Sequence, residues 1–283
     1  MIYISSSCIQ NNKIKDSVEQ LALNGFKNIE LSGGTHYYEG FEDDLLELKE
    51  KYKLNYRCHN YFPPPKEHFV VNLASLDESI YNKSIDHIKG AISLSKLLGS
   101  CKYGFHAGFL INISTNEIGK KISNSSLYSR KESIRKFCLA YENIKESTDS
   151  VDLYIENNVL SKTNFETFKG VNAFMLTNFS EYNSLKEKVD FNLLFDVAHL
   201  KVSAKTLGLN WEDEFNNMIN VSNYIHISDN DGFHDLNNQL TTSSNMFSML
   251  KQSDTSNKTF TLEIYDGIDA IKKSYETLLE AII

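Results

Sequence analysis

Residues 191–200 read FNLLFDVAHL, a short hydrophobic run that ends in a carboxylate, Asp196, with His199 three positions later. The run 191–196 has the length and the aliphatic and aromatic content of a buried β-strand. Charged side chains are rare inside such strands, so the position of Asp196 at the end of the run is informative. The same succession, a short buried run and then a polar residue, recurs along the chain and decides its fold class.

Outward from this stretch, short β-branched or aromatic runs alternate with longer segments of helical periodicity. The predicted strands are 2–6, 28–31, 54–59, 102–106, 153–156, 191–196, 224–227 and 259–264. The predicted helices are 13–24, 42–52, 78–98, 130–146, 180–188, 211–218, 246–251 and 271–282. Eight consecutive strand–helix units is the number that closes a parallel barrel.

The sequence therefore predicts an α/β fold, a single (β/α)8 TIM barrel that spans residues 1–283 as one domain. The alternative, an open doubly wound sheet, is typical of chains with a glycine-rich first turn, whereas the first turn here reads SSSCIQNNK. The segments after the third, fourth, fifth and seventh strands are long, namely 60–76, 107–128, 157–179 and 228–244. Loops at that end of a barrel build active sites, and we expect segment 107–128 to be a lid.

Composition and charge restrict the classes of function. The chain has 29 basic and 37 acidic residues, which gives a net charge of -8, and only three of the basic residues are arginine. Nucleic acids and anionic membranes bind basic surfaces, so we expect neither as a partner. No stretch reaches the roughly 18 apolar residues of a membrane span. We predict a cytoplasmic location, because no secretory signal is visible and the four cysteines form no CxxC pair.

Polar side chains gather at the carboxyl ends of seven of the predicted strands. They are Glu30, His59, His106, Glu156, Asp196, His226 and Glu263, with His199, Asp229 and Asp231 a few residues beyond their strands. The carboxyl ends of barrel strands meet at one face of the barrel, and that face holds the active sites of such enzymes. This shared position distinguishes the set from polar residues scattered over a solvated surface.

Four of these residues are spaced by about one strand–helix unit. Glu156 and Asp196 are 40 residues apart, Asp196 and His226 are 30 apart, and His226 and Glu263 are 37 apart. Side chains from four consecutive strands can converge, and three converging carboxylates repel one another without a cation. Three carboxylates and one imidazole suit Mn²⁺, Mg²⁺, Co²⁺ or Zn²⁺. We therefore predict one divalent metal ion at Glu156, Asp196, His226 and Glu263.

The ordered set of motifs resembles the xylose isomerase-like TIM-barrel superfamily, which includes sugar isomerases, ketose 3-epimerases, inosose dehydratases and the endonuclease IV group. The matching stretches are NIEL (28–31), HN (59–60), GFHAGF (104–109), YIENN (154–158), FDVAH (195–199), IHISDNDG (225–232) and TLEIY (261–265). They span nearly the whole chain in family order, and that order, rather than any single stretch, carries the resemblance.

The resemblance implies a metal-dependent isomerase or epimerase that acts on a small sugar or sugar derivative. It implies that Glu156 and Glu263, besides binding the metal, exchange the substrate proton on opposite faces through a metal-stabilised enediolate. It also implies that His199 binds a substrate oxygen. The other polar residues near the strand ends are predicted to bind substrate: His59, His106, Glu30, Asp229 and Asp231. Relatives are often dimers, so the resemblance also suggests a homodimer.

Other functions stay open at this point. The endonuclease IV group holds three zinc ions and needs an Asp-x-His element after the seventh strand, but here Asp235 is followed by Asn237 in place of that histidine. His59 and His106 match other zinc ligands of that group, so an endonuclease IV-like zinc phosphodiesterase is the main alternative. A dehydratase or hydrolase on the same metal site is another, and so is a barrel that binds sugar without catalysis.

Overall fold

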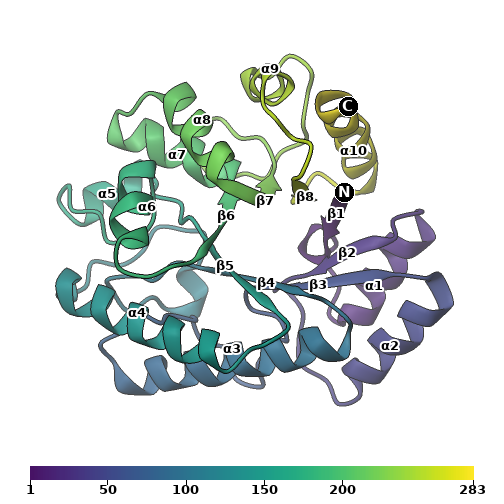
Figure 1. Cartoon of the computed structure of the whole chain (residues 1–283), viewed down its shortest axis with the longest axis horizontal. Coiled ribbons are helices and arrows are strands. Elements are labelled where there is room, and N and C mark those ends of the chain that lie inside the picture. Colours follow the sequence, from purple (N-terminus) through teal and green to yellow (C-terminus); the bar gives the residue numbers. More distant parts are fainter.

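The computed structural model describes residues 1–283 and has a closed barrel of eight parallel strands at its centre (Figure 1). The strands are β1 (Ile2–Ser5), β2 (Asn28–Leu31), β3 (Asn55–His59), β4 (Lys102–His106), β5 (Asp152–Glu156), β6 (Asn192–Asp196), β7 (Ser222–Ile227) and β8 (Thr259–Leu262). Each strand pairs with the next one along the chain, and β8 closes the ring by pairing with β1, where Tyr3 lies opposite Thr261. The predicted (β/α)8 barrel is confirmed.

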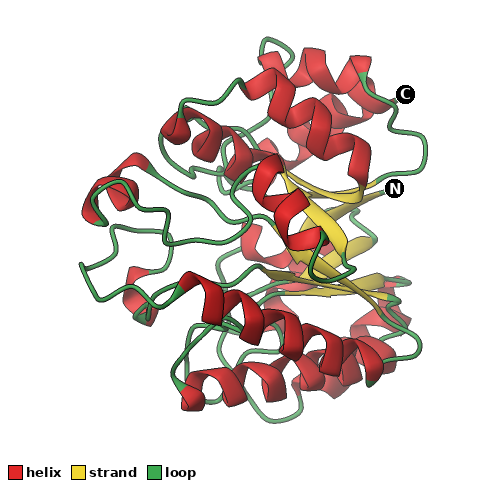
Figure 2. Ribbon diagram, turned by 60° about the vertical axis from the view of Figure 1, so that its left-hand side comes forward, coloured by secondary structure: helices red, strands yellow, loops and turns green.

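Helices form the outer layer around the strands (Figure 2). They are α1 (Ile14–Leu23), α2 (Phe41–Tyr52), α3 (Glu78–Leu97), α4 (Arg130–Glu146), α5 (Lys162–Thr167), α6 (Phe179–Lys186), α7 (Val197–Leu207), α8 (Trp211–Val221), α9 (Asn245–Gln252) and α10 (Ile268–Ile282). Two short 3₁₀ helices, η1 (Ser6–Cys8) and η2 (Thr115–Glu117), follow β1 and β4. None of the α-helices combines the length and the hydrophobicity that crossing a membrane requires.

Helix α3 illustrates how the sequence sets the outer layer. The Asp77 carboxylate accepts hydrogen bonds from the N–H groups of Ser79 and Ile80, at 2.8 and 3.2 Å, and so satisfies donors that have no partner within the helix. Ile88 and Ile92, one helical turn apart, are buried. The cap therefore fixes where the helix begins, and the buried stripe fixes which side packs against the barrel.

Helices α5 and α7 are absent from the sequence-based prediction. Helix α7 has buried residues on most of its sides, among them Val197, Leu200 and Ala204, so it lacks the one-sided hydrophobic stripe by which amphipathic helices are recognised. Helix α5 has only six residues and lies inside the long segment after β5. Strand β8 also ends earlier than predicted, so that Glu263 is the first residue beyond it.

The long loops after β3, β4 and β5 are held together by their own hydrophobic group. Its buried members are Val70, Phe109, Ile111, Ile122, Leu160, Phe168, Ala173 and Phe174. Phe109 and Phe174 also pair through an isolated antiparallel bridge. Segment 107–128 is therefore anchored at several points, and its exposed residues lie on both sides of the buried Ile122.

The barrel interior is filled tightly enough that one strand position has room only for glycine. A Cβ atom added at Gly104 would lie 2.5 Å from Cδ1 of Leu194 and 3.2 Å from Cδ2 of His59. We expect Gly104→Ala to lower the free energy of unfolding by about 1–3 kcal/mol, because overpacking of a filled interior forces neighbouring atoms to move. Denaturant unfolding followed by circular dichroism measures this change.

Gly90 in α3 is the matched control, because a Cβ added there meets nothing within 4 Å. Gly90→Ala should raise the free energy of unfolding by about 0.5–1 kcal/mol, since glycine in a helix interior costs conformational entropy. Equal stability of Gly104→Ala and the wild type would show that the interior is looser than described.

Candidate metal centre

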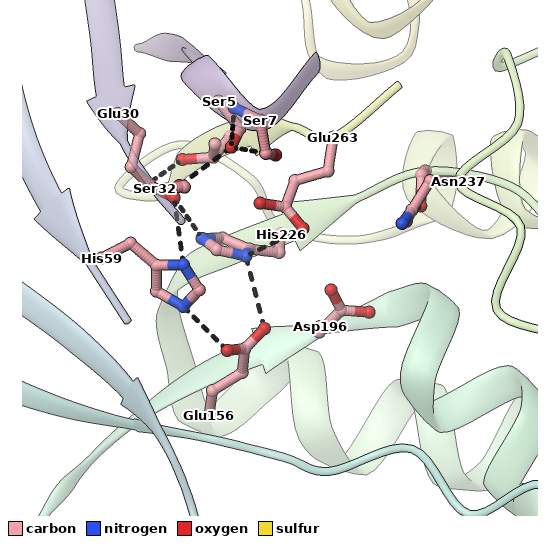
Figure 3. A network of polar contacts seen from close by, with 12 residues as sticks. Ser5, Ser7, Glu30, Ser32, His59, Glu156, Asp196, His226, Asn237 and Glu263 are labelled. Atoms are coloured by element: carbon pink, nitrogen blue, oxygen red, sulfur yellow. Dashed lines mark hydrogen bonds and ion pairs between the residues drawn. The ribbon is translucent and has the colours of Figure 1, made fainter. Parts of the chain in front are cut away.

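Strand register brings the predicted ligands together at the carboxyl end of the barrel. His106 of β4 lies opposite Glu156 of β5, and Asp196 of β6 lies opposite His226 of β7. Because side chains alternate between the two faces of a strand, paired residues on neighbouring parallel strands point to the same face. Glu263, just beyond β8, completes the set, and Figure 3 shows Glu156, Asp196, His226 and Glu263 gathered in one region.

Glu156 is the residue around which the cluster is organised. Its side chain is almost wholly buried, and its two carboxylate oxygens face different partners. Oε2 lies 2.8 Å from Nε2 of His59 and 3.0 Å from Nδ1 of His106. Oε1 lies 3.3 Å from Nδ1 of His226. Two histidines thus contact one oxygen of Glu156, while the other oxygen faces the remaining predicted ligands.

His226 lies between the two glutamates that are predicted to exchange the substrate proton. Its Nδ1 atom is 3.3 Å from Oε1 of Glu156 and 3.8 Å from Oε2 of Glu263. Figure 3 shows these carboxylates approaching the imidazole from different sides. Nδ1 is buried and makes no hydrogen bond, although an unpaired buried nitrogen costs free energy. An atom of this kind suits a metal ligand.

The donor atoms fit a divalent cation. Ligand atoms of Glu156, Asp196 and His226 all lie within 4.8 Å of one another, and Glu263 belongs to a second group of the same kind that also contains His226. Carboxylate oxygens together with one imidazole nitrogen are ligands that Mn²⁺, Mg²⁺ and Zn²⁺ accept. The predicted ligands are therefore brought together as two groups that share His226, rather than as one compact set of four.

Asp196 is held in place by its own helix and by a residue that the sequence analysis did not single out. Its Oδ1 atom accepts a hydrogen bond from the N–H of His199 at 2.7 Å and so caps α7. The Asn157 side chain donates to the carbonyl of Asp196 at 2.9 Å and accepts from its N–H at 2.8 Å. Asn157 follows Glu156 directly at the end of β5, and this position was the only sequence signal for it.

The electrostatics of the cluster also fit a positively charged partner. Burial raises the pKa of Asp196 to about 7, and the Glu156 carboxylate contributes to the rise. Burial likewise raises the pKa of Glu263. Burial opposes the positive charge of His226, but the carboxylates around it outweigh this effect and raise its pKa well above the ordinary value. Carboxyl groups that are costly to ionise in this place are groups that a bound cation would stabilise.

His199 lies at the side of the cluster and contacts Asp235. Its Nδ1 atom is 2.9 Å from the backbone carbonyl of Asn157, and its Nε2 atom is 3.3 Å from Oδ2 of Asp235. Asn237 stands nearby along the chain, and its Oδ1 atom accepts a hydrogen bond from the Ser228 hydroxyl at 2.8 Å. The side chain that replaces the histidine of the Asp-x-His element is therefore engaged with its own loop.

Three of the residues predicted to bind substrate, Glu30, Asp229 and Asp231, have the following local partners. Glu30 is wholly buried, and one of its carboxylate oxygens lies within 4.8 Å of ligand atoms of His59, His226 and Glu263. Asp229 forms an ion pair with Lys201, with 2.6 Å between Oδ1 and Nζ. Asp231 is exposed, and its carboxylate lies 2.9 Å from Nδ1 of His234 within the loop after β7. Sequence places these residues near strand ends, but it does not give their local partners.

A family comparison agrees with this architecture. Residues 18–281 match the family described as xylose isomerase-like TIM barrel. The chain belongs to this family. The match covers all predicted ligands of this xylose isomerase-like TIM barrel, and the resemblance drawn from its motifs is confirmed. No sequence among the curated proteins matches the chain.

Solved structures of the same fold include both classes of enzyme that the sequence motifs suggested. A D-tagatose 3-epimerase-like protein is 19% identical with a TM-score of 0.74, covering 99% of this chain and 96% of its own. D-psicose 3-epimerase from Clostridium cellulolyticum is 11% identical with a TM-score of 0.66, covering 99% and 97%. Endonuclease IV from Thermus thermophilus is 14% identical with a TM-score of 0.61, covering 99% of both chains. At these identities the similarity establishes the fold.

Proposed function

We propose that this protein is a divalent-metal-dependent isomerase or epimerase of a small sugar or sugar derivative. The observation that carries the proposal is the placement of two carboxylates around one point. Glu156 and Glu263 approach Nδ1 of His226 to 3.3 and 3.8 Å from different sides (Figure 3). A planar substrate fragment held between two such carboxylates can lose a proton on one side and regain one on the other.

The residues divide the chemistry as follows. One glutamate removes a proton from a carbon next to a carbonyl group, and the electron pair of that C–H bond moves toward the carbonyl to give an enediolate. The other glutamate returns a proton to the opposite face of the same carbon, or the first returns it to the neighbouring carbon. A divalent cation held by Asp196, His226 and the two glutamates would polarise the carbonyl and so acidify the C–H bond.

The surrounding residues support these roles. His59 and His106 contact Oε2 of Glu156 and hold the orientation of that carboxylate. His199 is one of the imidazoles at the edge of the cluster, and its Nε2–H, which lies 3.3 Å from Oδ2 of Asp235, is proposed to donate to a substrate oxygen that displaces this contact. Burial of Glu263 raises its pKa, which helps this carboxyl group to carry a proton between steps. The names of two structural neighbours, both 3-epimerases or similar to one, favour the same reaction class.

Solvent deuterium exchange tests the proposal. Protein loaded with Mn²⁺, Mg²⁺, Co²⁺ or Zn²⁺ in separate samples is incubated in D₂O with a panel of ketoses, ketose phosphates and related keto sugars. Mass spectrometry and NMR should find deuterium at one carbon next to the carbonyl of at least one compound. No exchange in any compound with any metal, from protein shown to be folded and metal-loaded, would count against an isomerase or epimerase.

A second candidate function has one observation in its favour. His59, His106 and Glu156 form a cluster next to the predicted metal site, and His106, Glu156 and His199 bring donor atoms within 4.8 Å of one another. A second cation there would suit a metal-dependent phosphodiesterase, since paired cations stabilise the oxygens of a phosphoryl displacement. The net charge of -8 disfavours a nucleic acid as the substrate.

Metal content separates the two candidates. For an isomerase or epimerase we expect about one bound metal ion per chain after dialysis, measured by inductively coupled plasma mass spectrometry. His59→Ala should leave this ratio unchanged, because in a one-metal enzyme His59 orients Glu156 and is not a metal ligand. Two or three zinc ions per chain, with the extra ions lost in His59→Ala, would instead favour the phosphodiesterase.

A further inference from the structure

A chain of buried polar contacts runs through the barrel interior below His226. Oε1 of Glu30 lies 2.8 Å from Nε2 of His226, and neither side chain has any exposed surface. The other carboxylate oxygen of Glu30, Oε2, accepts hydrogen bonds from the hydroxyl of Tyr224 and, at 2.7 Å, from the hydroxyl of Thr261. These residues belong to β2, β7 and β8, so one carboxylate connects three strands across the interior.

The two oxygens of Glu30 therefore have separate tasks. Oε2 is occupied by two hydroxyl donors, which fix the orientation of the carboxylate. Oε1 is left to face Nε2 of His226 as an ion-pair contact at 2.8 Å, and neither of these two atoms makes a hydrogen bond. A carboxylate can only accept, so this contact favours the proton on Nε2. The lone pair of a neutral His226 is then on Nδ1, the atom that faces Glu156 and Glu263.

We propose that Glu30 is a positioning residue that holds His226 in the Nε2–H tautomer with Nδ1 directed to the metal, and that Tyr224 and Thr261 lock Glu30 in that orientation. The inference rests on the proposed metal site. It replaces the prediction from sequence that Glu30 binds substrate. A carboxylate below a ligating histidine keeps the ring from rotating and makes its free nitrogen a better ligand.

The contact with His59 supports the same role for Glu30. Nδ1 of His59 lies 4.0 Å from Oε1 of Glu30, and the rings of His59 and His226 are 4.6 Å apart between centroids. Nε2 of His59 in turn contacts Glu156 at 2.8 Å. Movement of Glu30 would therefore disturb both the ligating histidine and a histidine that orients a ligating carboxylate.

Variants along this chain of contacts should weaken metal binding in a defined order. Glu30→Leu removes the acceptor, and we expect its Mn²⁺ dissociation constant to rise about 10- to 100-fold. Glu30→Gln keeps one oxygen that can face Nε2, so its dissociation constant should lie between those of Glu30→Leu and the wild type. Tyr224→Phe and Thr261→Val keep the carboxylate but each remove one hydroxyl that donates to Oε2 of Glu30. Each should raise the Mn²⁺ dissociation constant less than Glu30→Leu does.

Thr259→Val is the matched control for Thr261→Val. Thr259 also belongs to β8, but its hydroxyl accepts from Arg57 and donates to the carbonyl of Asn223, away from Glu30. The Mn²⁺ dissociation constant of the Thr259→Val protein should therefore equal that of the wild type. Circular dichroism establishes that each variant is folded before its affinity is compared.

Two measurements test the proposal without any substrate. Free Mn²⁺, followed by electron paramagnetic resonance during titration of metal-free protein, gives the dissociation constants, and the order above is expected. Long-range ¹H–¹⁵N NMR of the Zn²⁺-loaded wild type should find His226 protonated at Nε2 and not at Nδ1. A proton on Nδ1, or a folded Glu30→Leu protein with wild-type affinity, would overturn the proposal. Failure of deuterium exchange on every sugar would overturn the proposed function and leave both of these readouts unaffected.

Discussion

Replacing Glu263 by glutamine is expected to slow carbon–deuterium exchange by about 10²- to 10⁴-fold, the usual contribution of a general acid or base. Glutamine has nearly the same shape as glutamate, so the position beyond β8 can keep its packing. The amide cannot take or return a proton, however, so the exchange step loses one of the two carboxylates that transfer the proton. The exchange rate is measured by mass spectrometry on the sugar that gives the strongest signal with the wild type.

Glu280→Gln is the control for this variant. Glu280 lies on α10 and forms an ion pair with Lys251 at the surface. The exchange rate of the Glu280→Gln protein should therefore equal that of the wild type. Metal content has to be measured in both proteins, because Glu263 is also a proposed ligand. Wild-type exchange by a metal-loaded Glu263→Gln protein would contradict the assignment of Glu263 as a proton carrier.

Metal binding is expected to raise the thermal unfolding temperature by roughly 5–10 °C. A ligand that binds only the folded state contributes about 2.7 kcal/mol at a concentration 100 times its dissociation constant. For a chain of this size, each kcal/mol corresponds to about 2–4 °C. The effect should be large here because Glu156, Asp196 and His226 bring two carboxylates and an imidazole within 4.8 Å of one another. Differential scanning fluorimetry with Mn²⁺ and with a chelator measures the shift.

Asp196→Ala should lose most of this shift, because it removes a proposed ligand. Asp231→Ala should keep it, since Asp231 is exposed and its carboxylate contacts only its own loop. A wild-type shift in Asp196→Ala, or the same loss in both variants, would show that the cation binds elsewhere.

Parallel strands explain why so much of this architecture could be predicted from sequence. Each strand of a barrel ends at the same face, so a polar residue at the end of a hydrophobic run has a known position in space. Asp196 and His226 could be placed together for this reason, and the register of β6 and β7 puts them opposite each other. Glu156 and His106 are paired in the same way between β4 and β5.

Depth inside the barrel and local loop contacts could not be predicted in this way. Glu30 is the penultimate residue of β2, and sequence alone does not show that its buried carboxylate lies 2.8 Å from Nε2 of His226. Asp229 follows β7 closely, but Lys201 of α7 draws its carboxylate away. Helix α7 itself lacks a one-sided hydrophobic pattern, so neither the helix nor this ion pair could be inferred from the sequence.

Anomalous diffraction from a crystal grown with Mn²⁺ locates the bound metal ion itself. We predict one strong peak per chain, surrounded by the side chains of Glu156, Asp196, His226 and Glu263. A second peak among His59, His106 and Glu156 would shift the assignment toward a two-metal phosphodiesterase. Absence of a peak at the four-residue site, in a crystal with Mn²⁺ well above the measured dissociation constant, would contradict the metal centre and the reaction proposed for it.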